Sequence, residues 1–167
     1  TDTGVYIHVG PEIGVASTKA FTGQVTVLTL LALALGHEQG TLDDADYHEM
    51  IEELSEIPQK MEKVLEQAPM IKSLALMFTY AHNFLYLGRG MNFPVALEGA
   101  LKLKEISYIH SEAYAAGELK HGTISLIEQG MLVIGVLTQD ELYEKTISNM
   151  LECKSRGAYL MGLTTYG

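Results

Sequence analysis

The sequence predicts an α/β fold in which helices cover both faces of a parallel sheet. Three short apolar runs carry most of that prediction, at residues 83–87, 131–137 and 158–163. A glycine turn, Gly88-Arg89-Gly90, leads from the first run into a helix with Pro94 in its first turn. Short strands that alternate with helices are typical of parallel sheets. As a phosphate-binding loop the Gly-Arg-Gly turn is a weak pattern, because it lacks the fuller glycine motifs.

The first forty residues are expected to contain a strand, a loop and a long helix. Residues 4–9 are apolar enough for a buried strand, and Ser17 is the candidate N-cap of a helix over residues 18–35. This helix is apolar on most sides, which predicts burial on nearly all sides. Nothing in the sequence precedes the strand to pair with it, so we expect a partner subunit or further N-terminal sequence to cover it.

Helices are also expected between and after these elements. Residues 43–66 are acidic with apolar residues at helical spacing, which is typical of an amphipathic connector whose carboxylates face water. Residues 70–80 form the next expected helix. An amphipathic helix is expected over residues 141–156, with Gly157 as its C-cap. The last strand follows it directly, and we expect a further helix or strand beyond residue 167.

Composition and charge argue against several classes of function. The formal net charge of −10 disfavours a nucleic-acid backbone or an anionic membrane surface as partner. The single cysteine, Cys153, rules out an internal disulfide and is expected to be a small buried residue. The most apolar run, residues 25–35, is too short to span a bilayer. The histidines show no metal-ligand spacing. We therefore expect a soluble, cytoplasmic protein with no metal and no cofactor.

Three charged residues, Glu98, Lys102 and Glu105, form the candidate catalytic group. At about 100° per residue they lie in one narrow stripe of a helix, and apolar residues flank the stripe. Such surroundings can raise a carboxylate's pKa while a neighbouring ammonium lowers it, and a general base or acid needs that tuning. The alternative is an ordinary i,i+4 surface pair worth about 0.2–0.5 kcal/mol. Spacing alone favours this alternative, because helical Glu/Lys pairs are common.

His121 lies in a segment that follows this helix. Residues 111–117 are rich in small side chains, and Glu118-Leu-Lys-His121-Gly122 comes next. A histidine followed by glycine can sit on a turn and reach towards a site. The Glu118-x-x-His121 spacing also occurs in di-iron bundles, but the sequence holds no second copy to complete such a site.

Three stretches resemble the isomerase half of the glucosamine-6-phosphate synthase family. They are residues 12–22 (EIGVASTKAFT), 87–90 (LGRG) and 98–122 (EGALKLKEISYIHSEAYAAGELKHG). The resemblance covers essentially the whole chain and implies two sugar-isomerase domains, each a doubly wound parallel αβα sandwich, here truncated at both ends. It assigns residues 1–40 to the first domain, 41–68 to a helical connector and 69–167 to most of the second domain.

The resemblance also implies a role for each candidate residue. Glu105 matches the base that moves a proton between C1 and C2 of the sugar, and Lys102 and Glu98 match neighbours that hold and polarise its oxygens. His121 matches a histidine that assists ring opening from the adjacent subunit of a dimer. The loop that closes against the sugar is matched by Val15, Ala16 and Ser17. Aldose–ketose interconversion needs a carboxylate beside a carbon-bound proton and a donor at the oxygens, so these roles fit together.

The implied activity is the synthesis of glucosamine 6-phosphate from fructose 6-phosphate and glutamine-derived ammonia. The family's glutaminase domain, its phosphate-binding loops and its Schiff-base lysine lie outside these residues, so we expect the isolated chain to be inactive and to form a homodimer or larger assembly. Thr123 departs from the family, which usually has proline there. The alternative function is a non-catalytic sugar-phosphate-binding regulatory module, which has no need of a general base.

Overall fold

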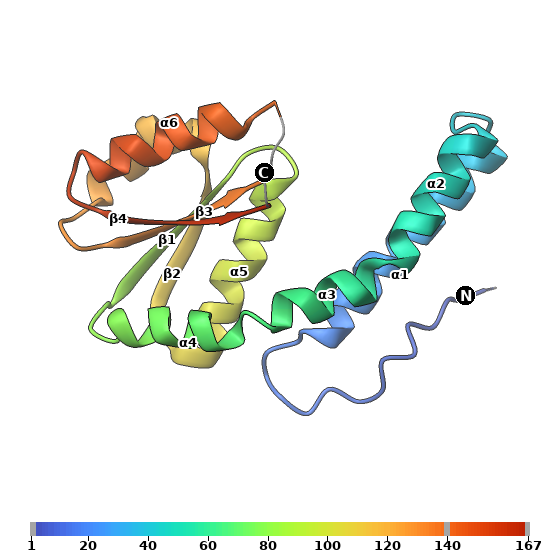
Figure 1. Ribbon diagram of the computed structural model, residues 1–167, viewed down its shortest axis with the longest axis horizontal. Coiled ribbons are helices and arrows are strands. Elements are labelled where there is room, and N and C mark those ends of the chain that lie inside the picture. Colours follow the sequence, from blue (N-terminus) through green and yellow to red (C-terminus); the bar gives the residue numbers. More distant parts are fainter. Residues whose placement is uncertain (1–2, 139–140, 166–167) are drawn as a thin grey trace. The chain divides into compact units, whose positions relative to one another are not determined.

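The computed structural model describes residues 3–138 and 141–165, which form two compact units. The first unit spans Thr1–Ala75 and the second Leu76–Gly167. Figure 1 labels the helices and strands of both units.

The first unit is helical, and its helices follow from local signals. Helix α1 (Lys19–Glu38) is joined by a short turn to α2 (Asp44–Ser55), where the Asp43 carboxylate caps the helix by accepting from Asp46 N at 2.9 Å. At the same turn His37 Nε2 lies 2.7 Å from Asp44 Oδ1. Helices α3 (Ile57–Leu65) and α4 (Ala68–Met77) follow.

The structure corrects three expectations for this unit. Residues 4–9 are not a strand, because a strand needs a hydrogen-bonded neighbour and the described part of this unit contains no other strand. Helix α1 begins at Lys19 after Thr18, so Ser17 is not its N-cap. The expected helix over 43–66 breaks at Glu56, because Pro58 cannot continue a helix and instead occupies the first turn of α3.

Helix α1 is also far more exposed than its composition predicts. Of its described residues only Leu33 is buried. The helix is longer than the eleven-residue apolar run, and by length and composition alone it could cross a membrane, with a mean hydropathy of 1.4. Core helices of soluble proteins and signal sequences meet the same test, so length and composition by themselves do not identify a membrane span.

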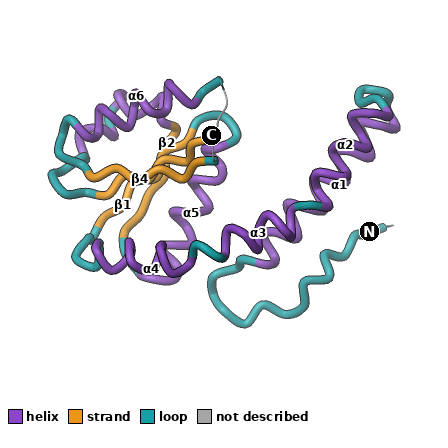
Figure 2. The backbone as a smooth tube through the Cα atoms, viewed as in Figure 1, coloured by secondary structure: helices purple, strands orange, loops and turns teal. Residues whose placement is uncertain are grey.

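The second unit contains the predicted parallel sheet. Its strands are β1 (Asn83–Gly88), β2 (His110–Ala115), β3 (Leu132–Leu137) and β4 (Tyr159–Thr164), in the order β2-β1-β3-β4. Every pairing is parallel, and the strands run through the middle of the unit in Figure 2. Strand β2 was not predicted, because its sequence HSEAYA has no apolar run. It is an edge strand, and an edge strand needs less apolar surface.

Two hydrophobic clusters show that helices cover both faces of this sheet. On one face the buried side chains of β1 and β3 pack against α6 (Tyr143–Lys154) and the turn after β2, through residues that include Leu87, Val133, Cys153 and Leu119. On the other face Phe84 and Leu132 pack with Leu103 of α5 (Asn92–Ser107). The expected α/β fold, with a parallel sheet between helical layers, is therefore confirmed, as is the burial of Cys153.

Candidate active site

Helix α5 carries the charged stripe, and close backbone packing fixes its position on the sheet. Gly88 ends β1 so near the start of α5 that a Cβ there would collide with the Asn92 carbonyl and lie 2.8 Å from Phe93 N. In the second turn of the helix Gly99 lies against the ring of Tyr86, where a Cβ would meet the ring at 3.1 Å. The buried Ser111 of β2 donates its Oγ proton to Ala100 O of the same helix at 2.6 Å.

The structure brings Glu98, Lys102 and Glu105 together as one ion-paired row. Lys102 Nζ lies 2.7 Å from Glu105 Oε2 and 3.3 Å from Glu98 Oε1. The three side chains are only 22%, 19% and 23% exposed, which distinguishes the row from an ordinary surface pair. The row thus places an ammonium between two carboxylates on one face of α5, with each side chain only partly exposed.

The electrostatics of the row keep Lys102 charged. Its hydrogen bond to Glu105, supported by the one to Glu98, raises the pKa of the ammonium above its ordinary value, although partial burial opposes the shift. Lys102 is therefore a cation at neutral pH. A fixed cation beside a carboxylate can stabilise negative charge that develops on a nearby oxygen.

His121 lies on a separate, tightly folded segment. It ends the 3₁₀ helix η1 (Ala116–His121), which the fully buried Leu119 anchors to the core. The histidine side chain is 73% exposed, and its Nε2 lies 4.0 Å from Glu118 Oε2. The following Gly122 has φ of 141°, which favours glycine. The expectation of a histidine on a glycine turn is confirmed, and the ring is free to meet a ligand or a second subunit.

Thr123 begins the next 3₁₀ helix, η2 (Thr123–Leu126). The hydrogen bond from the Tyr114 hydroxyl of β2 to Glu112 Oε2, at 2.7 Å, raises the pKa of Tyr114, and the nearby Thr123 side chain opposes that shift.

Val15, Ala16 and Ser17 lie in the first unit, in the loop before α1. Val15 is 86% exposed, whereas Ser17 Oγ donates to Glu12 Oε2 at 3.2 Å. A role for this loop beside the charged row stays a prediction.

Sequence reasoning missed a polar group at the carboxyl end of the sheet. Arg89, directly after β1, donates from Nε to Asn149 Oδ1 of α6 at 3.2 Å, and the buried Asn92 donates from Nδ2 to Thr138 Oγ1 after β3 at 2.7 Å. Both bonds join residues far apart in the sequence, so no local spacing could reveal them. The available signal was the position of Arg89 and Thr138, each directly after a predicted strand of a parallel sheet.

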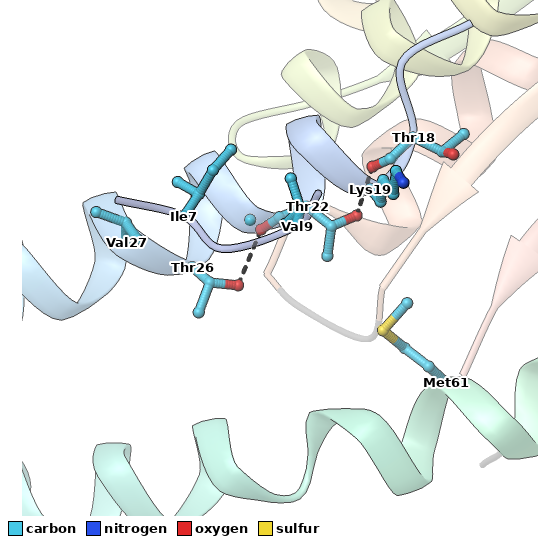
Figure 3. A pocket seen from close by; sticks show the side chains of 9 residues that line it. Ile7, Val9, Thr18, Lys19, Thr22, Thr26, Val27 and Met61 are labelled. Atoms are coloured by element: carbon cyan, nitrogen blue, oxygen red, sulfur yellow. Dashed lines mark hydrogen bonds between the residues drawn. The ribbon is translucent and has the colours of Figure 1, made fainter. Parts of the chain in front are cut away.

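One hollow in the first unit is lined by none of these predicted residues. It measures about 480 Å³ and is lined by Ile7, Val9, Thr18, Lys19, Thr22, Gly23, Thr26, Val27 and Met61. In Figure 3 the chain at Ile7 and Val9 runs along α1, whose Thr22 and Thr26 hydroxyls bond back to its own carbonyls. These polar groups are satisfied within the helix, and the hollow has no clustered donors for a ligand. Among the described residues, no group of three or more His, Cys, Asp or Glu side chains could hold a metal ion.

Comparison with known proteins identifies relatives across the whole chain. A family profile described as "SIS domain" matches residues 77–166. The glutamine--fructose-6-phosphate aminotransferase [isomerizing] of Bacteroides thetaiotaomicron is 59% identical over all 167 residues, and that of Clostridium tetani is 51% identical over 166. The chain spans 27% of the length of each of these two relatives.

Solved structures agree with these sequence relatives. The C-terminal domain of glucosamine-fructose-6-phosphate aminotransferase from Francisella tularensis superimposes with a TM-score of 0.90 at 42% identity, covering 93% of this chain and 43% of that one. Glucosamine-6-phosphate deaminase from Thermotoga maritima superimposes with a TM-score of 0.67 at 26% identity, covering 92% and 44%. The resemblance stated from the sequence motifs is thereby confirmed.

Proposed function

The chain belongs to the SIS domain family, and from this premise we propose that it is the part of an isomerising glutamine–fructose-6-phosphate aminotransferase that carries the sugar-isomerising base. The observation that carries the proposal is the shielded row Glu98–Lys102–Glu105. This row occurs in a chain whose 167 residues are 59% identical to the matching part of an enzyme of that name.

In the proposed reaction Glu105 moves a proton between C1 and C2 of an open-chain sugar phosphate. Its Oε2 lies 2.7 Å from Lys102 Nζ, so the ion pair with a residue of the same helix holds the carboxylate in place. The ammonium of Lys102 donates to a sugar oxygen and stabilises the negative charge that forms there as the C–H bond breaks. Glu98 contacts the opposite side of Lys102, at 3.3 Å, and orients it.

Two further contributions complete the proposed sugar site. His121 assists opening of the sugar ring and, because its ring is 73% exposed, it is available to a site on an adjacent subunit. The loop of Val15, Ala16 and Ser17 closes against the sugar. The glutaminase domain, the phosphate-binding loops and the Schiff-base lysine would belong to the remainder of a longer cytoplasmic protein.

A segment exchange tests the proposal. The matched 27% of the Bacteroides thetaiotaomicron relative is replaced by these 167 residues, and formation of glucosamine 6-phosphate from fructose 6-phosphate and glutamine is measured. We expect a chimera with turnover within about tenfold of the parent enzyme, since a compatible segment retains the transition-state contacts. A folded chimera that binds fructose 6-phosphate without converting it would favour the regulatory-module alternative. A folded chimera that neither binds nor converts fructose 6-phosphate would contradict the proposed function.

A further inference from the structure

Helix α1 begins without a cap from its own N-cap residue. Thr18 has φ of −100° and ψ of −54°, and its side chain makes no capping hydrogen bond. The first N–H groups of a helix have no partner within the helix and need an acceptor from elsewhere. In this chain the acceptor comes from Glu12, six residues before Thr18.

The Glu12 carboxylate closes the loop onto the helix end through three donors. Its Oε1 accepts from Thr18 N at 3.2 Å, and its Oε2 accepts from Ala20 N at 3.0 Å and from Ser17 Oγ at 3.2 Å. The same loop is also spanned by a hydrogen bond from Lys19 Nζ to Pro11 O at 2.7 Å. Residues 13–16 are therefore held between two polar ties.

Packing contributes little to the position of this loop. Ile13 is 98% exposed and Val15 is 86% exposed, so neither apolar side chain anchors the segment. The conformation of residues 13–17 consequently depends on polar contacts, of which the Glu12 bonds and the bond from Lys19 to Pro11 are the ones described above. The negative charge at the N-terminus of α1 also suits the helix dipole.

We propose that Glu12 is a positioning residue for the sugar-binding loop, holding Ser17 and the first turn of α1 in the geometry that receives the substrate. This inference rests on the proposed function, because the loop's contact with sugar is part of that proposal. The bonds from Ala20, Thr18 and Ser17 also lower the pKa of Glu12, so the carboxylate is ionised and able to accept all three at neutral pH.

The structural half of the inference is tested by amide hydrogen exchange on the 167-residue chain. Glu12→Ala is expected to speed exchange in a peptide covering residues 13–21 by about fivefold, the effect of losing a cap. Exchange in residues 44–55 should not change. Glu49→Ala, at an exposed position of α2, serves as the matched control. Unchanged exchange at 13–21, or an equal rise across α1 and α2, would overturn the assignment.

The functional half uses the segment-exchange chimera. Glu12→Gln offers one carbonyl oxygen in place of two carboxylate oxygens, so we expect KM for fructose 6-phosphate to rise about five- to tenfold with little change in kcat. Glu12→Asp keeps a carboxylate on a shorter side chain, so KM should rise less than in Glu12→Gln. An unchanged KM together with faster exchange at 13–21 would show that the loop does not contact sugar. An inactive chimera with Glu12 intact would instead count against the proposed function, while the exchange result on the chain would still decide the role of Glu12 in the loop.

Discussion

The three charged side chains of α5 differ from an exposed helical pair in how many partners they share and how little water reaches them. A single exposed i,i+4 pair contributes about 0.2–0.5 kcal/mol. Here one ammonium serves two carboxylates, and each side chain is roughly four-fifths shielded. Removing Lys102 would leave Glu98 and Glu105, about two helical turns apart, with no cation between them. Keeping three charged side chains partly away from water costs more free energy than keeping an exposed ion pair. This cost is consistent with a chemical role for the row.

Glu105→Gln tests that role in the segment-exchange chimera. The amide retains the shape of the side chain and can still accept from Lys102 but cannot take a proton, so turnover should fall by roughly 10²–10⁴-fold. Glu128→Gln, at an exposed position in the same unit, should leave turnover unchanged. Steady-state kinetics with fructose 6-phosphate and a thermal melt of each variant give the comparison. Near-normal turnover in Glu105→Gln would show that another group is the base.

Cys153 is expected to be an inert thiol. Burial, with a smaller contribution from the Glu152 carboxylate, raises the pKa of the Cys153 thiol to about 11, although Arg156 opposes the shift. Thiolate is the reactive form, so at pH 8 the folded chain should react roughly 10²-fold more slowly than the unfolded chain with a chromogenic disulfide reagent. Raising the pH towards 11 should narrow that difference. Equal rates with and without denaturant at pH 8 would contradict the burial.

At the scale of elements, sequence patterns located those helices and strands of the second unit whose formation depends mainly on residues near them in the chain. The apolar runs gave β1, β3 and β4, and the proline in the first turn marked α5. Strand β2 was not predicted, because its pairing with β1 and the bond from Ser111 to Ala100 O depend on residues elsewhere in the chain. The ion-paired row was predictable from helical spacing, but its shielding was not. The polar contacts of Arg89 and Asn92 needed the folded sheet to bring their partners near.

The junction of β1 and α5 gives the sharpest test at this scale. Gly88→Ala places a methyl group against the backbone of Asn92 and Phe93, which a side-chain rotation cannot relieve. We expect the free energy of unfolding of the second unit to fall by about 1–3 kcal/mol. Gly4→Ala, where a Cβ meets nothing within 4 Å, should change it by less than about 0.5 kcal/mol. Denaturant titrations followed by circular dichroism measure both, and similar values for the two variants would contradict the close packing.

At the scale of the whole molecule, apolar surface that the chain leaves uncovered predicts assembly. On α1 alone, Leu28 is 63% exposed and Leu35 is 50% exposed, and on α5 Val95 is 55% exposed. Extended apolar surface of this kind is typical of interaction sites. We expect sedimentation at micromolar concentration to show a dimer or larger species. A monodisperse monomer would contradict this expectation, and with it the supply of His121 to a neighbouring site.

The chain by itself is expected to be catalytically silent. The described residues include the candidate base Glu105, the cation Lys102 and His121, but the sequence covers only 27% of the length of its aminotransferase relatives. The orientation of substrate supplies about 7–11 kcal/mol of rate acceleration in well-positioned reactions, and binding of a remote phosphate is one way to achieve it. A base that meets an unoriented sugar loses that contribution. We therefore expect no glucosamine 6-phosphate from fructose 6-phosphate with either glutamine or ammonia, and no saturable isomerisation to glucose 6-phosphate. A coupled assay of the purified chain, with the active chimera as positive control, measures both products. Saturable isomerisation that disappears in Glu105→Gln would show that these 167 residues contain a complete sugar site.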